Sequence, residues 1–277
     1  MTLSLITKDL IKLALLEDIS NGDITTNSIF SEDNKGSVKI ISREDGIFCG
    51  QSVVNEIINT YTSLSIKWNK NDGEELEKNS IITYIEGSIK ELLTYERVIL
   101  NFMERLSGIS TLSNKMSQII IDTDAKLVDT RKTTPGWRWL EKYAVKIGGS
   151  NNHRFNLSDG ILIKDNHKFA AGSISKAIKQ AKKQAQHSLK IEAEVDNISE
   201  MEDAIKAGAD IILLDNFSIE DTKKAVEIVN GQIILESSGN ITEKNILDYA
   251  KTGIDYISSG YLTYGATWLD FSSEYGK

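Results

Sequence analysis

The chain has almost none of the residues on which disulfide-linked proteins depend, and no segment suited to crossing a membrane. Its 277 residues include one cysteine, Cys49, which excludes an intrachain disulfide. No apolar run approaches the ~20 residues that a membrane-spanning helix needs. Charged residues, among them Lys8, Asp9, Lys12 and Glu17, interrupt the first apolar pattern, which indicates an amphipathic helix and not a signal peptide. We therefore expect a soluble, cytoplasmic protein with Cys49 buried in its core.

A surplus of positive charge is also missing. The chain carries 32 Lys and Arg against 40 Asp and Glu, for a net charge of −8, which argues against nucleic acid or an anionic membrane as its partner. At 40% hydrophobic and 26% charged residues, the composition is that of a globular protein with one large or two ordinary domains. An acidic chain that gathers cations in one stretch is expected to bind a small anion there.

That stretch is 128–165, where cations lie close to two short apolar runs that are expected to form strands. Its cationic side chains are Arg131, Lys132, His153, Arg154 and Lys164. So many cations at strand ends indicate a site for an anionic ligand, and the rest of the chain can be interpreted as its scaffold or complement.

The first third of the chain mixes helical and strand patterns. Apolar residues at helical spacing predict helices near the N-terminus and around 53–61, and a long helix over 90–121 with a break near Ser107 and Gly108. Short runs separated by turn residues predict the strands 37–42, 46–48, 64–68 and 81–86. We therefore expect an α+β domain over residues 1–110, with the C-terminal tail 266–277 packing back on it.

From Ala125 onward strands and helices alternate about six times, which is typical of parallel β/α architecture. The predicted strands are 126–129, 160–164, 190–195, 210–215, 232–236 and 255–258. A doubly wound sheet should show a Gly-rich crossover near its first strand, and the sequence has none. Nearly every strand instead ends in polar residues, as in a β/α barrel. Because a full barrel needs eight units, we predict an open, incomplete β/α barrel over residues 111–265.

Local signals add detail to this barrel. Ser199 with Glu202, and Ser218 with Asp221, have the spacing of helix capping boxes. A helix after Thr242 is expected to offer its positive N-terminus to an anion.

The strand 190–195 alternates charged and apolar residues. Its period places Lys190, Glu192 and Glu194 on one face, which is either a solvated edge or the inside of the barrel. Inside the barrel the carboxylates need partners, and Lys164, Arg131 and Lys190 are available. Glu194 and Asp215, at the ends of neighbouring strands, then form a carboxylate pair. Such a pair is either part of a structural salt-bridge network or a site that binds Mg²⁺ or faces a developing positive charge.

The last two strands end in similar tetrapeptides, Ser-Ser-Gly-Asn (237–240) and Ser-Ser-Gly-Tyr (258–261). Each alone is an ordinary turn sequence. Together, at equivalent strand ends, they predict a site for a phosphate monoester.

The sequence shows no pairing of a nucleophile with a base. His153 and His167 could each act as a base, although a lone histidine is more often structural. The expected site is therefore an electrostatic clamp, with cations for carboxylates and pyrophosphate, carboxylates for a cationic centre, and glycines for a phosphate. These requirements suit glycosyl transfer from a phosphorylated, pyrophosphate-activated sugar.

At this point the motifs are recognisable, and the chain resembles the quinolinate phosphoribosyltransferases over nearly its full length. The most specific string is DTRKT followed by GG-x-x-NHR and IKDNH. The segments that carry the resemblance are 16–26, 96–111, 129–136, 141–154, 161–167, 192–197, 207–216, 235–242 and 257–263. The resemblance implies an N-terminal sandwich-like α/β domain and an open barrel. It also implies the reaction of quinolinate with phosphoribosyl pyrophosphate, giving nicotinate mononucleotide, pyrophosphate and CO₂ with Mg²⁺.

The resemblance further implies roles for individual residues. Arg131, His153 and Arg154 match the quinolinate clamp, with Lys132 and Lys164 beside the bound anions as binding and catalytic residues. Glu194 and Asp215 match the carboxylates on the ribose and metal side, with the metal held directly or through water or substrate. The phosphate-binding positions are Ser238, Gly239, Asn240, Gly260 and Tyr264. Arg97 matches an arginine donated by a neighbouring subunit, which implies a homodimer or larger assembly.

Two positions depart from the family pattern. Tyr264 stands where the family usually has histidine, so a neutral hydroxyl replaces a cation near the phosphate, and Asn240 replaces the last glycine of SGG. Two alternatives follow: a catalytically silent paralogue that kept the nucleotide pocket, and a paralogue associated with molybdate transport. The second tends to lack IKDNH, which this chain keeps at 163–167. The retained cations and carboxylates argue against the first.

Overall fold

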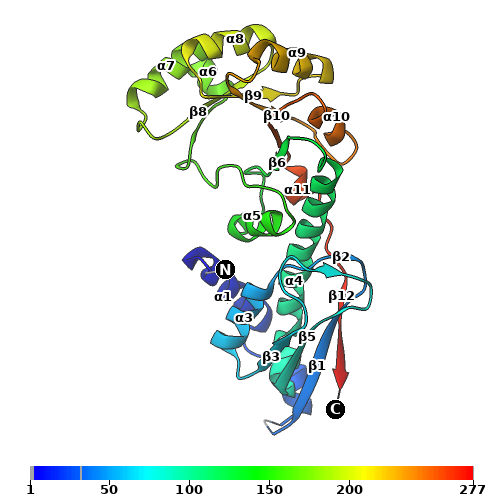
Figure 1. Ribbon diagram of the computed structural model, residues 1–277. Coiled ribbons are helices and arrows are strands. Elements are labelled where there is room, and N and C mark those ends of the chain that lie inside the picture. The colour runs from blue at the N-terminus through cyan, green and yellow to red at the C-terminus, as the bar shows by residue number, and fades with distance from the viewer. Residues whose placement is uncertain (1–2, 32, 277) are drawn as a thin grey trace. The chain divides into compact units, whose positions relative to one another are not determined.

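Residues 3–31 and 33–276 are described by a computed structural model, in which the chain divides into two units (Figure 1). The first unit comprises the described residues up to Asn114, together with Thr133–Gly149 and the residues from Gly265 onward. The second unit comprises Lys115–Lys132 and Ser150–Tyr264. One boundary near residue 110 was expected, but the first unit also includes Thr133–Gly149, which interrupts the second unit in sequence.

The first unit is built on an antiparallel sheet with the strand order β12-β1-β5-β3. These strands are β1 (Lys35–Ser42), β3 (Ser65–Trp68), β5 (Ile81–Ser88) and β12 (Phe271–Gly276), and β2 (Gly46–Ile47) pairs separately with β4 (Glu75–Leu76). Its first helices are α1 (Leu5–Ile19), α2 (Ile24–Ile29) and α3 (Gln51–Tyr61). The predicted helix around 53–61 is confirmed, and its apolar residues Val53, Val54, Ile57 and Ile58 are buried. Through β12, the C-terminal segment joins this sheet beside β1.

The long helix α4 runs from Ile89 to Ile119 without interruption, so the predicted break near Ser107 and Gly108 is wrong. Gly108 serves a close approach instead, since a Cβ at this position would lie 1.8 Å from the carbonyl oxygen of Thr267. The Ser107 hydroxyl accepts the N–H of Cys49 at 2.9 Å and donates to its carbonyl oxygen at 3.1 Å. Ser107 and Gly108 of α4 are therefore the points at which other segments of the first unit pack against this helix.

The helix α5 (Arg138–Ile147) belongs to the first unit, although the sequence analysis placed it within the barrel. Its buried carboxylate Glu141 pairs with Arg105 of α4 at 2.8 Å. The hydroxyl of Ser110 donates to the carbonyl oxygen of Ala144 at 2.8 Å. These contacts fix α5 against α4, so the segment between β6 and the rest of the barrel packs outside the second unit.

The second unit contains a six-stranded parallel sheet with the order β6-β11-β10-β9-β8-β7. The strands are β6 (Lys126–Val128), β7 (Ile161–Ile163), β8 (Ile191–Val195), β9 (Ile211–Asp215), β10 (Ile234–Ser238) and β11 (Tyr256–Ser258). In the described chain the edge strands β6 and β7 do not pair with each other. The predicted open barrel is confirmed, and its opening lies between these two strands.

Helices follow the strands, and α7, α8 and α9 cover the outer face of the curved sheet (Figure 1). They are α6 (Asp165–Ala171), α7 (Ile174–Gln184), α8 (Ile198–Ala207), α9 (Ile219–Val229), α10 (Ile246–Ala250) and α11 (Tyr261–Tyr264). The predicted cap of α9 is confirmed, because Ser218 accepts the N–H of Asp221. Two details are corrected. Asn197, and not Ser199, caps α8. The helix expected after Thr242 begins only at Ile246, after a turn in which the Asn245 side chain accepts the N–H of Thr242.

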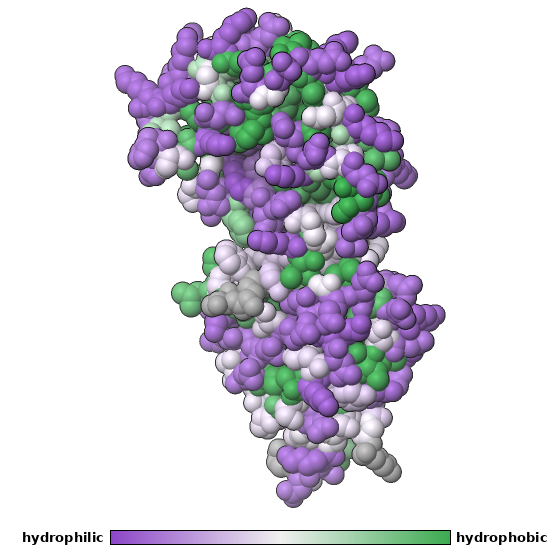
Figure 2. Space-filling view, in the orientation of Figure 1, coloured by the Kyte–Doolittle hydropathy of each residue, from purple (hydrophilic) through white to green (hydrophobic). Residues whose placement is uncertain are grey.

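The surface matches the composition. Figure 2 shows hydrophilic residues over most of the viewed face, with hydrophobic residues in separate patches among them. Of the helices in the described residues, none has both the length and the apolar character that crossing a membrane requires.

Candidate active site

The carboxyl ends of the barrel strands and the loops that follow them line a cleft of about 670 Å³. In a parallel sheet these ends meet at one edge, so residues from distant parts of the chain converge there. The cleft brings together the predicted site residues Arg131, Lys132, His153, Arg154, Lys164, Glu194, Asp215, Ser238, Gly239, Asn240, Gly260 and Tyr264. Arg97, in contrast, is an exposed residue of α4 and belongs to the first unit.

Lys132 occupies a loop whose backbone is held on both sides. Its N–H donates to the Thr130 hydroxyl at 3.0 Å, and its carbonyl oxygen accepts the Thr263 hydroxyl at 2.7 Å. A Cβ on Gly260 would lie 2.9 Å from the Lys132 side chain, so the glycine leaves room for it. The exposed ammonium group is thus carried by a fixed backbone.

Arg154 is half-buried at the same edge and donates from Nη1 to the carbonyl oxygen of Gly160 at 2.8 Å. Burial, and then the charge of neighbouring Arg131, lowers the pKa of its guanidinium below the usual value. Two guanidinium groups placed near each other repel until an anion lies between them. This arrangement favours a ligand with carboxylate or phosphate groups.

Lys164 and Glu194 form an ion pair across the cleft edge, from the ends of β7 and β8. Both Glu192 and Glu194 are buried, as predicted for an inward face of β8. The expected inward position of Lys190 is wrong, because β8 begins at Ile191 and Lys190 is exposed. The ring of His167 accepts the N–H of Lys164 at 2.9 Å through Nδ1, so this histidine caps the start of α6.

A lysine that the sequence analysis did not consider ties the loops after β7 and β8 together. Lys168 is buried, and its Nζ lies 2.7 Å from Asp165, 3.0 Å from Asp196 and 3.1 Å from Glu200. Three carboxylates around one ammonium hold the start of α6 against α8. This network supports the loops that present Lys164 and Glu194.

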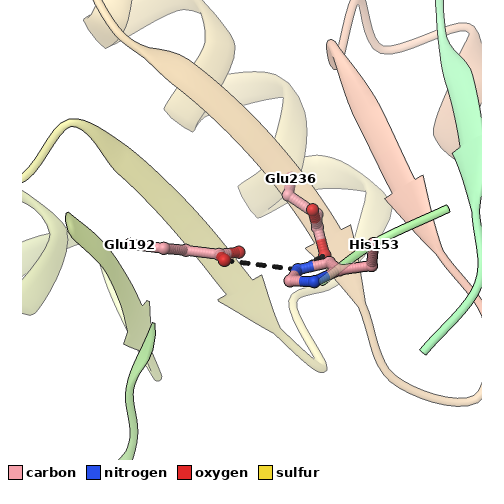
Figure 3. A group of neighbouring side chains, drawn as sticks. All are labelled: His153, Glu192 and Glu236. Atoms are coloured by element: carbon pink, nitrogen blue, oxygen red, sulfur yellow. Dashed lines mark ion pairs between the residues drawn. The ribbon is translucent and has the colours of Figure 1, made fainter. Parts of the chain in front are cut away.

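His153 and Glu236 line the cleft and form a cluster with the buried Glu192 (Figure 3). The His153 Nε2 atom lies 3.2 Å from a Glu192 oxygen and 3.6 Å from Glu236 Oε1. Both glutamates are buried, and within the described chain Glu192 Oε1 and Glu236 Oε1 have no hydrogen-bond partner. Burial, followed by the charge of Glu192, raises the pKa of Glu236 from 4.5 to about 7. The carboxyl group of Glu236 is therefore protonated more readily near neutral pH than that of an ordinary glutamate.

The ring nitrogens of His153 decide what this cluster can do. Nδ1 accepts the backbone N–H of Arg154 at 2.7 Å, so the ring proton is on Nε2 and points toward the glutamates. A metal at Nε2 would need that proton moved to Nδ1, where the N–H of Arg154 already points. The three ligand atoms lie within 4.8 Å of one another, but this bond favours a hydrogen-bonded acid cluster over a metal centre.

Several residues of the cleft were not predicted from the sequence to belong to the site. In the sequence, Glu236 and Asn216 are polar residues at strand ends with no further signal. The structure places Glu236 beside His153, which is distant from it in the sequence. The remaining lining residues that were not singled out from the sequence are Thr130, Leu157, Leu162, Leu213 and Ile241. The apolar members among them give no distinctive pattern in a sequence.

Comparisons with known proteins agree along the whole chain. The model of the "Quinolinate phosphoribosyl transferase, N-terminal domain" matches residues 23–107, and that of the C-terminal domain matches residues 109–274. A Bacillus subtilis protein named "Probable nicotinate-nucleotide pyrophosphorylase [carboxylating]" is 41% identical over 268 residues, which cover 96% of this chain and 92% of the relative.

Solved structures give the same result. The nicotinate-nucleotide pyrophosphorylase from Ehrlichia chaffeensis superposes with a TM-score of 0.95 at 41% identity, covering 100% of both chains. The nicotinate-nucleotide pyrophosphorylase from Francisella tularensis gives a TM-score of 0.92 at 43% identity, covering 98% of this chain and 96% of the other.

Proposed function

The chain belongs to the quinolinate phosphoribosyltransferase family, and on this premise we propose how its cleft performs the family's reaction. The protein transfers the phosphoribosyl group of phosphoribosyl pyrophosphate to the ring nitrogen of quinolinate. Decarboxylation then gives nicotinate mononucleotide, with release of pyrophosphate and CO₂, a step in NAD biosynthesis. The observation that carries the proposal is one cleft that combines Arg131 and Arg154 with the carboxylates Glu194 and Asp215.

Quinolinate is held through its two carboxylates. Arg131 and Arg154 supply the cationic groups. Burial, and then the charge of Arg131, lowers the pKa of Arg154, and a carboxylate between the two guanidinium groups would offset their repulsion. His153 contributes one N–H, from Nε2, which in the free protein faces Glu192. Binding at this end orients the ring nitrogen toward C1 of the ribose, and such positioning lowers the barrier of the transfer step.

The donor occupies the carboxylate and phosphate end of the same cleft. Ser238, Gly239, Asn240 and Gly260 surround its 5′-phosphate, and the Tyr264 hydroxyl adds a neutral hydrogen bond at the rim. Lys132 and Lys164 stabilise the departing pyrophosphate, while Glu194 and Asp215 face the positive charge that develops on the ribose. The ion pair between Lys164 and Glu194 holds both side chains ready for these roles.

Mg²⁺ fits the carboxylates of this cleft. Glu194 and Asp215 offer hard oxygen ligands at neighbouring strand ends. Glu194 is already paired with Lys164, so Asp215 would be the better placed of the two carboxylates to hold the ion. When bound, the ion neutralises charge on the pyrophosphate leaving group.

Decarboxylation follows from the transfer. Once the ring nitrogen is bonded to ribose it carries a positive charge, so the electron pair left at C2 by CO₂ loss is stabilised as an ylide. A proton then adds to C2. Loss of CO₂ from C3 would leave an electron pair that is not adjacent to the cationic nitrogen, so only the 2-carboxylate leaves.

The proposal is tested with alternative acceptors. Purified protein with phosphoribosyl pyrophosphate and Mg²⁺ is expected to form nicotinate mononucleotide from quinolinate and none from nicotinate, which lacks the second carboxylate. Product from nicotinate at a similar rate would contradict the dicarboxylate clamp. Absence of product from either acceptor, with donor binding retained, would favour the silent paralogue.

We further propose that the active protein is a homodimer or larger assembly in which Arg97 reaches the cleft of a neighbouring copy. Its exposed position on α4 supports this role. Separate Arg97→Ala and Lys132→Ala proteins are expected to be nearly inactive. Subunit exchange at equal concentrations should restore about a quarter of wild-type activity, because half of the dimers carry one intact site.

The matched control exchanges Lys132→Ala with Lys164→Ala subunits. Both changes lie in the second unit, so no hybrid dimer gains an intact site and activity should stay at the background. Equal behaviour of the two mixtures would contradict a site shared between subunits.

The composition and the buried Cys49 support a cytoplasmic location for this protein.

A further inference from the structure

The loops after β9 and β10 are joined by a short chain of side-chain amides inside the cleft. The backbone N–H of Asn216 donates to the carbonyl oxygen of Ser238 at 2.8 Å, which fixes the two loops against each other. Asn216 and Asn240 both have left-handed backbone angles, with φ of +53° and +51°. Asparagine tolerates this region better than most residues, although glycine adopts it with less strain.

The side chains of these residues form a directed relay. Asn240 Nδ2 donates to Asn216 Oδ1 at 3.2 Å, and Asn216 Nδ2 donates to Asp215 Oδ2 at 2.9 Å. An amide group can pass such an interaction on because it has an acceptor at one end and a donor at the other. Gly239 leaves the room for it, since a Cβ there would lie 2.2 Å from Asn216 Oδ1.

We propose that Asn240 is a positioning residue that holds the carboxylate of Asp215 through Asn216. The inference rests on the proposed function, in which the loop of Asn240 binds the donor phosphate and Asp215 faces the ribose. Both ends of the relay would then contact one donor molecule. When the 5′-phosphate of the donor occupies the loop, it holds the Asn240 side chain in place. Asn240, through Asn216, then holds the orientation of the Asp215 carboxylate at the ribose.

The backbone at Asn240 does not depend on its own side chain. Its carbonyl oxygen accepts the Asn245 side chain at 3.2 Å, and that side chain also takes the N–H of Thr242 at 2.8 Å. Replacement of Asn240 by glycine therefore removes the relay while leaving the loop held. Glycine is also less strained at this φ, so the change should not destabilise the fold. Any effect on donor binding can then be attributed to the lost relay.

The first test compares Asn240→Gly with the wild-type protein. We expect the KM for phosphoribosyl pyrophosphate to rise about three- to tenfold, the effect of one lost hydrogen bond. The KM for quinolinate and the unfolding midpoint should be unchanged, or the midpoint slightly higher. The matched control is Asn230→Gly, an exposed C-cap of α9 with φ +45°, which should have the same effect on folding and none on either KM.

A double-mutant cycle distinguishes the relay from a direct phosphate contact. Donor binding with Mg²⁺ is measured by calorimetry for wild type, Asn240→Gly, Asp215→Ala and the double variant. If Asn240 acts through Asp215, its replacement weakens binding in the wild-type background and adds little once Asp215 is absent. Additive losses, or unchanged binding by Asn240→Gly, would overturn the inference while leaving the proposed function in place. Failure of the wild-type protein to bind the donor would overturn both.

Discussion

The Lys132→Ala protein is expected to fold as the wild type does and to lose about 10²- to 10³-fold in kcat/KM, the usual loss when one transition-state donor is removed. The reason is that the Lys132 side chain provides a charge in the cleft, whereas its backbone makes the hydrogen bonds that hold the loop. Its ammonium group is exposed in the cleft, whereas its N–H and carbonyl oxygen are bonded to Thr130 and Thr263. Alanine keeps both backbone bonds and removes only the charge.

Steady-state kinetics and thermal unfolding of the same preparation measure the two effects. Lys224→Ala provides the control, because Lys224 is an exposed lysine of α9 that pairs with Asp221 of the same helix. It should be neutral in both assays. Unfolding of the Lys132→Ala protein would mean that the cationic cluster is structural. Full activity would remove Lys132 from the mechanism.

Replacing Glu236 by glutamine is expected to stabilise the protein above neutral pH and to have little effect near pH 5. Burial and Glu192 raise the pKa of Glu236 to about 7, while His153, Ser258 and Lys164 oppose that rise. In the unfolded chain the carboxyl loses its proton near its ordinary pKa of 4.5. Between these values the native state binds the extra proton, so the free energy of unfolding falls as pH rises through this window.

Glutamine imitates the neutral form and removes this dependence. The free energy of unfolding should differ from that of the wild type by up to ~3 kcal/mol at pH 8.5, with the variant more stable, and should converge near pH 5. Denaturant unfolding at both pH values measures the difference. Glu202→Gln, at an exposed position of α8, should show no such pH dependence. A Glu236→Gln protein that is less stable at pH 8.5 would show that the charged carboxylate is favoured in the fold.

The sequence predicted the features that local patterns encode. Asp215 ends an apolar run and Glu194 lies near the end of an alternating strand. Their place at one edge of a parallel sheet therefore followed from the alternation of strands and helices. The open barrel followed from counting six strands, and the sheet order confirms it. The residue roles came from a family resemblance and not from spacing.

Features that depend on tertiary contacts were missed or wrong. Glycine within a helix suggested a break at Gly108, because nothing local shows that the chain near Thr267 packs against it. The partner of Glu192 was expected to be a cation such as Lys190 and is instead His153, which lies in a loop far from Glu192 in the sequence. Likewise α5 has an ordinary helical sequence, and only the contact of Glu141 with Arg105 places it in the first unit.

The most direct test of the central claim follows labelled carbon through one turnover. Quinolinate labelled in the 2-carboxylate is incubated with the protein, phosphoribosyl pyrophosphate and Mg²⁺, and a parallel sample is labelled in the 3-carboxylate. We predict that label from the 2-carboxylate appears entirely in CO₂, in equal amount to nicotinate mononucleotide and pyrophosphate, while label from the 3-carboxylate stays in the nucleotide. Release of the 3-carboxylate, or nucleotide formed without CO₂, would contradict this account of the cleft.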